Sequence, residues 1–241
     1  MGIDKLFLLL ISSLATAFAA SVTGMGQGMT LLALMSMFIP HQLIIPIHGI
    51  KQFFSNFFVF AYLYKHLHYR TICYFVVGVV PGALIGYQLL AIIKSNTIFL
   101  VILALMTIIT AIKPKFAPAI RLNTIGFSVL GLVAAMLAPI IGAVGPLLAP
   151  FFIRSKFERQ TFVSTKACCQ MAVHLSKVPV FLAADFPYGL YDIPILLVIV
   201  SSYIGTVLGV NVLHKIKQKT FTNLLRIVLL IMGIMMLWKL A

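Results

Sequence analysis

Long apolar runs separated by short polar segments recur along the whole chain. The short alternating apolar and polar segments of a transmembrane β-barrel are absent, so the runs predict helices. Several reach the roughly 20 residues that a helix needs to cross a hydrocarbon core about 30 Å thick. The pattern predicts an all-α polytopic membrane protein with about eight apolar helical segments. The long runs cover residues 6–20, 43–63, 72–93, 98–112, 125–141, 193–213 and 224–237.

The chain divides into two halves of similar plan. A polar linker loop, 114–122, separates a first transmembrane repeat, 1–113, from a second, 123–241. In each half an apolar segment runs into a glycine-rich break, which is followed by a short apolar stretch and then by three long segments. The short stretches, 29–39 and 147–153, are too short to cross a bilayer as helices.

The two breaks are the first candidates for a binding site. They contain Gly24, Gly26 and Gly28 in the first half, and Gly142 and Gly145 in the second. Half-length helices that follow a break at matching places in two halves are the best sequence indication of a transporter's binding site. The N-termini of such half-helices carry partial positive charge, so we expect the breaks to help bind an anion.

The basic residues distinguish two membrane topologies. If each break only kinks one span, the basic loops 154–159 and 215–219 face outside while Asp185 and Asp192 face inside, which contradicts the positive-inside rule. If each break instead turns a re-entrant hairpin, three full crossings remain in each half and these loops face the cytoplasm. We therefore predict two inverted pseudo-symmetric repeats, each a glycine-broken re-entrant hairpin plus three transmembrane helices.

Composition agrees with this prediction. Hydrophobic residues make up 62% of the chain and charged residues 9%, with a mean hydropathy of +1.12. A soluble domain has about 25% charged residues, so a soluble fold is excluded. The net charge of +14 comes mostly from short clusters between apolar runs, which indicates membrane orientation and not nucleic-acid binding. The expected location is the cell (inner) membrane, multi-pass, with the lipid bilayer and a small anionic substrate as partners.

Lys51 is the most informative single residue. It lies about ten residues after His41, so it sits roughly 15 Å along its helix, near the bilayer middle. A lysine there costs several kcal/mol and should face a cavity or a partner, or else be held by helix-end carbonyls or deprotonated by burial. His48, one turn earlier, could hold a proton or a substrate oxygen, or simply pack. Gln52 and Asn56 are polar lining or helix–helix contacts.

A matching lysine is expected in the second half. Sliding the halves by 115 positions sets Lys51 on Lys166, and two such lysines would form a pocket for a small anion. The alternative is that Lys166, only seven residues after Arg159, extends to the membrane surface. His174 and Lys177 repeat the His48/Lys51 spacing, outside this register. Ser164, Thr165 and Gln170 are likewise polar lining or helix–helix contacts.

Several chemistries are missing from the chain. No apolar run contains Asp or Glu, which argues against a carboxylate proton relay or sodium cage. No Walker loop, HExxH or GxSxG motif occurs, so we expect no enzyme, cofactor or metal. Cys73, Cys168 and Cys169 lie in apolar segments, where small buried hydrophobic side chains are the favoured interpretation. A membrane redox or thiol protein using Cys168 and Cys169, or a non-transporting scaffold, remains the alternative.

A stripe of small residues on one predicted helix is compatible with either a monomer or a homodimer. Gly78, Gly82 and Gly86 recur every four residues on one helix face. Such a face could pack against another helix of the same chain or against a second copy, which would make a homodimer.

The break and the lysine motifs together resemble those of the sulfite exporter TauE/SafE family. The likeness rests on Gly24, Gly26 and Gly28 after the first apolar segment, on Lys51–Gln52, on Thr165–Lys166–Ala167, and on the two-fold plan. The resemblance covers the full chain and implies a bacterial-type inner-membrane permease for small sulfur-containing anions such as sulfite or organosulfonates. The chain departs from the pattern at Ile50, where asparagine is expected, and at Val144 and Pro146, where glycines are usual.

Overall fold

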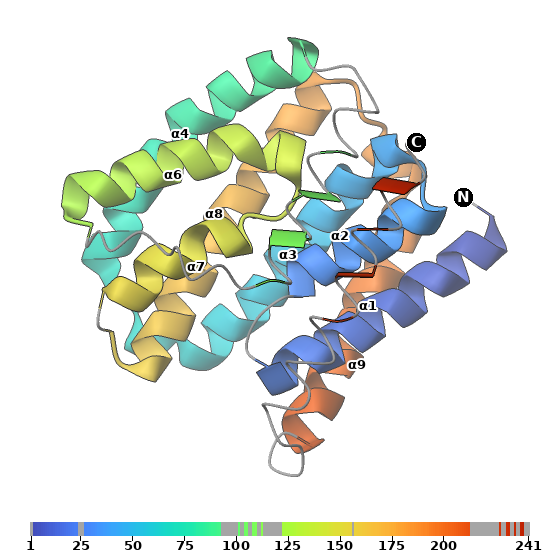
Figure 1. The fold of residues 1–241 in the computed structure, drawn as a ribbon, viewed down its shortest axis with the longest axis horizontal. Helices are drawn as coiled ribbons and strands as arrows, with labels where there is room; N and C mark the ends of the chain where they lie inside the picture. The colour runs from blue at the N-terminus through green and yellow to red at the C-terminus, as the bar shows by residue number, and fades with distance from the viewer. Residues whose placement is uncertain are drawn as a thin grey trace. The chain divides into compact units, whose positions relative to one another are not determined.

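A computed structural model of the chain describes residues 2–23, 27–92, 122–155 and 157–212, with isolated helical positions within 101–112 and 227–238. The described residues are nearly all helical and include no strand, which confirms the predicted all-α class (Figure 1). Most of the apolar runs 98–112 and 224–237, the linker 114–121, Gly24 and Gly26 lie outside the described residues. The helices are α1 (Ile3–Thr23), α2 (Gln27–Phe38), α3 (His41–Leu63), α4 (Tyr69–Ile92), α6 (Thr124–Ile141), α7 (Gly145–Arg154), α8 (Arg159–Ala183) and α9 (Asp192–Val212), with short 3-10 turns η1 (Tyr64–His66) and η2 (Tyr188–Leu190).

Among the described residues, four helical segments are long and apolar enough to cross a membrane. They are His41–His66, Tyr69–Leu90, Thr124–Ile141 and Asp192–Gly209. The shorter apolar helix Gln27–Phe38 is not long enough to do so, as expected for the stretch after the first break.

The chain forms two compact units that do not follow the order of the sequence. Unit 1 combines Met1–Lys51 and Ser95–Pro114 with Tyr188–Ala241, whereas unit 2 combines Gln52–Lys94 with Lys115–Pro187. Each unit therefore takes helices from both predicted repeats. In unit 1, α9 of the second half packs on α1 of the first, and in unit 2, α4 of the first half packs on α6 of the second.

Glycines allow the close approach of α4 and α6 in unit 2. A Cβ added at Gly82 would collide with the backbone of Leu132, and one added at Gly131 would collide with the carbonyl of Phe75. A Cβ added at Gly78 or Gly86 would also meet the α6 backbone. The glycine stripe on α4 is therefore used within the chain, so it does not provide a face for a second copy.

The same contacts recur between α1 and α9 in unit 1. A Cβ at Gly205 would collide with the carbonyl of Leu14, Ser201 Oγ donates to Leu10 O (2.6 Å), and Ser13 Oγ donates to Val198 O (3.0 Å). Each of these α1–α9 contacts has a counterpart between α6 and α4. Adding 118 to the α1 residue number and subtracting 123 from the α9 residue number gives the matching pair. The counterparts are 132/82, 128/78 and 131/75, and all three pairs are in contact. The two helix pairs thus pack in the same register.

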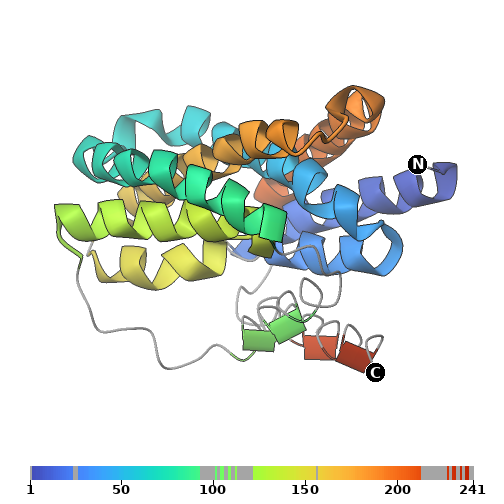
Figure 2. The same ribbon diagram turned by 90° about the horizontal axis from the view of Figure 1, so that it is seen from above.

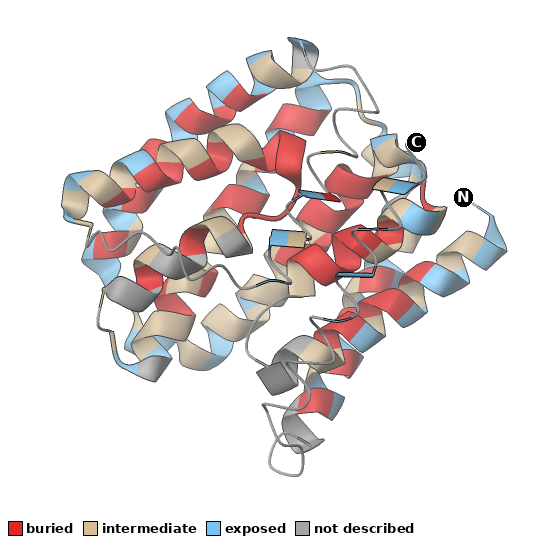
Figure 3. Cartoon of the chain, viewed as in Figure 1, coloured by how far each residue is buried: buried red, intermediate tan, exposed pale blue. Residues whose placement is uncertain are grey.

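The outer faces of these helices remain apolar. On α4, the residues that face α6 are buried while Val77, Val80 and Leu84 are exposed (Figure 3). On α9, Ile193 and Leu196 are exposed in the same way. A helix that is apolar all round is characteristic of a membrane span, because its outer face then contacts lipid.

The second break reverses the direction of the chain. Phe152, near the end of α7, packs against Phe127 in the first turn of α6, with ring centroids 5.4 Å apart. Because α7 reaches back to the start of α6, the two helices form an antiparallel hairpin, which Figure 2 shows side-on. In unit 1, α2 packs on α1 and likewise runs back beside it.

Candidate functional site

Local sequence explains why α6 ends and α7 begins where they do. Gly142 has φ 79°, a left-handed conformation that glycine adopts without strain, and its N–H donates to Ala138 O. Pro146 then occupies the first turn of α7, where a missing N–H costs nothing. Val144, which precedes α7, supplies no side-chain cap, so the first N–H groups of α7 are not bonded by a capping side chain.

Lys177 of α8 reaches this break. Its side chain is 1% exposed, and its Nζ donates a hydrogen bond to the carbonyl oxygen of Gly142. That carbonyl lies at the C-terminal end of α6, where backbone C=O groups lack helical partners and the helix dipole is negative. The ammonium group is thus held by the end of a helix.

Other polar residues of α8 lie on the same helix face as Lys177. Gln170 lies close to the start of α7, since a Cβ added at Gly145 would be 3.1 Å from Gln170 Nε2. Lys166, Gln170, His174 and Lys177 follow one another at steps of four, four and three residues, so they form one stripe along α8. His174, like Lys177, is buried.

The first break carries a comparable pair in unit 1. His48 is buried on α3, and its Nε2 lies 3.0 Å from the carbonyl oxygen of Gly28, in the first turn of α2. Lys51, one turn further along α3, is 1% exposed. Each unit therefore contains a buried His-x-x-Lys step with one member bonded to a carbonyl of a glycine break.

The hydroxyls of Ser164 and Thr165 form hydrogen bonds to the backbone of the segment between α3 and α4. Ser164 Oγ donates to His66 O (2.6 Å), and the N–H of His68 donates to Thr165 Oγ1 (3.0 Å). These bonds fasten the first turns of α8 to the segment that joins α3 to α4. Thr165, predicted as a substrate ligand, thus has a structural partner here.

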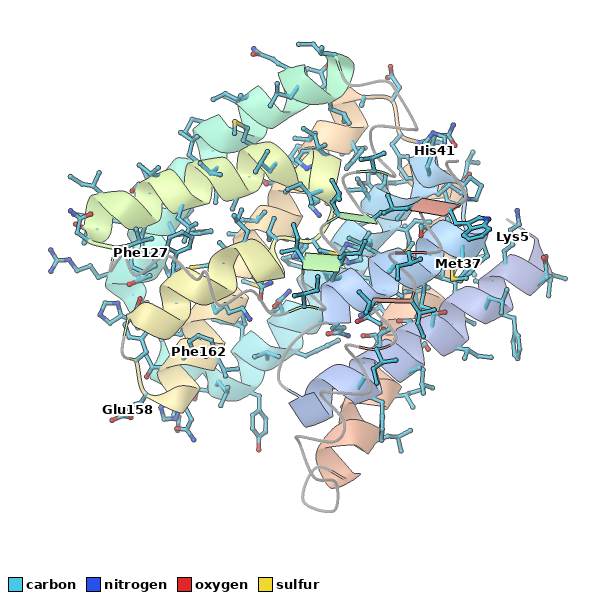
Figure 4. The ribbon with its side chains drawn as sticks, viewed as in Figure 1. Lys5, Met37, His41, Phe127, Glu158 and Phe162 are labelled. Atoms are coloured by element: carbon cyan, nitrogen blue, oxygen red, sulfur yellow. The ribbon has the colours of Figure 1, made fainter. Side chains whose placement is uncertain are left out.

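Lys166 is only half-buried. Its Nζ lies 5.7 Å from the ring centroid of Phe162, a cation–π distance, close to the first turn of α8 that Figure 4 marks with Glu158 and Phe162. Gln52 is buried on α3, and its backbone carbonyl oxygen accepts a hydrogen bond from Asn56 Nδ2 at 2.7 Å. The roles predicted for Lys166 and Gln52 in binding remain predictions.

The structure brings together part of the predicted site. Gly142, Gly145 and Gln170 lie together in unit 2, and Gly28 lies with His48 in unit 1. Lys177 was not among the predicted site residues, although its Nζ bonds the carbonyl oxygen of Gly142 in the second break, whereas Lys166 Nζ lies beside the Phe162 ring. The signal that could have identified it is the repeated His-x-x-Lys spacing.

The acidic side chains of the chain lie at the surface. The chain has four Asp and Glu residues in all, and each of them, Asp4, Glu158, Asp185 and Asp192, is exposed. Within the described residues, no group of three or more His, Cys, Asp or Glu side chains could hold a metal ion. The three cysteines are free thiols, and only Cys169 is buried.

The sequence matches one known protein family over nearly its whole length. The model of the family described as sulfite exporter TauE/SafE matches residues 8–236 of the chain. The chain belongs to the sulfite exporter TauE/SafE family. No curated protein and no solved structure matches the chain significantly.

Membership of the TauE/SafE family confirms the resemblance seen in the break and lysine motifs. It makes the chain a member of a family of membrane transporters, in agreement with its four helical segments long enough to span a membrane.

Proposed function

We propose that this protein is a multi-pass inner-membrane permease that moves a small sulfur-containing anion, sulfite or an organosulfonate, by alternating access. Family membership supports the class of substrate. The proposed cargo needs a cationic site that is removed from bulk water and can be reached from either side in turn.

Burial of Lys51 is the observation that carries this proposal. Its side chain is 1% exposed at the middle of a helix with the length and hydropathy of a membrane span. All four Asp and Glu side chains of the chain are exposed. A basic residue kept at membrane depth under these conditions is a functional site by default, and an anionic substrate is a suitable counter-charge.

The glycine breaks supply the second element of the proposed site. In unit 1, we propose that the first N–H groups of the half-length helix α2 and the side chain of His48 join Lys51 in binding an anion. In unit 2, the first N–H groups of α7 and the side chain of Gln170 are the proposed binding groups, and Gln52 is a further proposed ligand. Gly24, Gly26 and Lys166 remain proposed members of this site. The antiparallel return of α7 along α6 supports the re-entrant topology in each of two inverted repeats.

The proposal is tested by counterflow of radiolabelled sulfite in proteoliposomes. Lys51→Met removes the charge while preserving most of the volume, and we expect it to abolish flux while the protein still inserts. Lys65→Met is the matched control, because Lys65 is exposed beyond the end of α3 and the charge change is the same. Equal flux for Lys51→Met and wild type would show that the site is assigned wrongly.

Substrate identity is addressed by a separate measurement on purified protein. Sulfite, thiosulfate, sulfoacetate and taurine differ in charge and size but share an oxidised sulfur group. We expect the anionic members to raise the melting temperature of wild type and to have a smaller effect on Lys51→Met. Stabilisation by none of these compounds would argue against a sulfur-anion substrate.

A further inference from the structure

The C-terminal end of α6 is a place where a cation is stabilised. Gly142 stops the helix with φ 79°, and its own carbonyl lies beyond the last turn of α6, where the N–H groups of Gly142 and Ala143 cap Ala138 O and Ile141 O. The last carbonyl groups of α6 carry the negative end of the helix dipole. In secondary transporters built from broken helices, the C-terminal ends of half-helices are where coupling cations bind.

In this protein a side chain already occupies the position. Lys177 Nζ donates to Gly142 O from the neighbouring helix α8, and the lysine is 1% exposed. A buried ammonium needs a counter-charge or several hydrogen-bond acceptors. Every Asp and Glu side chain is exposed, and among the described residues the end of α6 provides the acceptor that Lys177 uses, Gly142 O.

At each break a different member of the His-x-x-Lys pair forms the hydrogen bond to a backbone carbonyl. In unit 1 the histidine, His48, bonds the carbonyl of Gly28, which lies at the N-terminal end of α2. In unit 2 the lysine, Lys177, bonds the carbonyl of Gly142, at the C-terminal end of α6. A fixed positive charge suits a helix C-terminus, so Lys177 has a different environment from a residue that awaits an anion.

We propose that the Lys177 ammonium is a tethered cation at the C-terminal end of α6, in the place of a coupling sodium ion, and that transport therefore requires no free metal cation. This inference deepens the proposed function and, for its flux prediction, rests on it. Its structural part, a cation site at Gly142, does not depend on transport.

The test combines flux with thermal stability. Wild-type sulfite counterflow should be the same within twofold in sodium, potassium and N-methylglucamine media. Lys177→Ala vacates the site, so we expect flux to fall at least tenfold without sodium and to recover partly when sodium is added. Sodium should also raise the melting temperature of Lys177→Ala by several degrees and leave that of wild type and of Lys65→Met unchanged.

Two results would overturn the inference. One is a wild type whose flux requires sodium. The other is a Lys177→Ala protein whose flux and melting temperature respond to sodium no more than those of wild type. If the alanine variant does not fold, Lys177→Met and Lys177→Arg replace it. The flux of the arginine variant should not depend on sodium. The methionine variant should be less stable than the arginine variant. Equal stability of these two would contradict a role for the charge.

The outcomes also separate this inference from the proposed function. If wild type moves no sulfite but sodium selectively stabilises Lys177→Ala, the cation site stands and the transport proposal fails. If wild type moves sulfite but sodium has no selective effect on Lys177→Ala, the transport proposal stands and the tethered cation does not.

Discussion

Phe152 of α7 packs edge-to-face on Phe127 of α6, with ring centroids 5.4 Å apart and ring planes at 73°. The two residues stand 25 positions apart, at opposite ends of a helix–break–helix segment. Their contact closes the hairpin, because it joins the tip of the short helix to the first turn of the long one. Both side chains are buried, so the contact belongs to the core of unit 2.

Truncation of this contact should weaken the hairpin. We expect Phe152→Ala to lower the free energy of unfolding by about 3 kcal/mol, because a buried phenylalanine is lost and a cavity remains. The measurement is the melting temperature of purified protein in detergent. Phe7→Ala on the exposed face of α1 is the control and should change little. Equal effects of the two variants would mean that the hairpin contact contributes no stability.

The shared register of the two helix pairs predicts that equivalent glycines are equally intolerant of substitution. At Gly82 and Gly205 an added methyl would strike neighbouring backbone, so we expect Gly82→Ala and Gly205→Ala each to destabilise the protein by about 1–3 kcal/mol. Gly189 has no atom within 4 Å of an added Cβ, which makes Gly189→Ala the matched control. Thermal melts of the three variants test this, and a tolerated alanine at either buried position would contradict the close packing.

The bonds of Thr165 predict a structural effect and not a binding effect. Thr165→Val removes the acceptor for the His68 N–H, and we expect a loss of about 1 kcal/mol in unfolding free energy with the KM for the anion unchanged. Ser164→Ala should behave similarly, because it removes the bond to His66 O. Flux measured over a range of anion concentrations separates the two roles. A raised KM with unaltered stability would restore Thr165 to the binding site.

The proposed re-entrant topology predicts which loops a membrane-impermeant thiol reagent reaches. Glu158→Cys, between α7 and α8, should react only from the cytoplasmic side, whereas Leu190→Cys, between α8 and α9, should react from outside. Both native residues are exposed, so the new thiols are accessible. The experiment uses a background in which Cys73, Cys168 and Cys169 are replaced. Reaction of the thiol at position 158 in intact cells would contradict inverted repeats and favour kinked spans.

Prediction from sequence succeeded where the signal is local. The ends of α2 and α7 follow the predicted short stretches within a few residues, because Gly142 and Pro146 set the backbone at the second break without help from distant residues. The choice of Lys166 over Lys177 rested on sliding one half along the other. That operation assumes equal loop lengths, and it cannot tell which position along the polar stripe of α8 lies beside the break; the binding role of Lys166 stays a prediction.

By itself, the sequence determined that this chain is a membrane protein of apolar helices interrupted by two glycine breaks, and its motifs determined the family. Hydropathy and glycine or proline conformation are properties of neighbouring residues, so they can be read along the chain. Only the tertiary structure decided that α4 packs with α6 and α9 with α1, and that Lys177 meets the carbonyl of Gly142. Those facts depend on helix faces brought together from both halves. Lys177 and Lys166 lie about three turns apart on α8, and only the packing places the first at the end of α6 and the second beside the ring of Phe162.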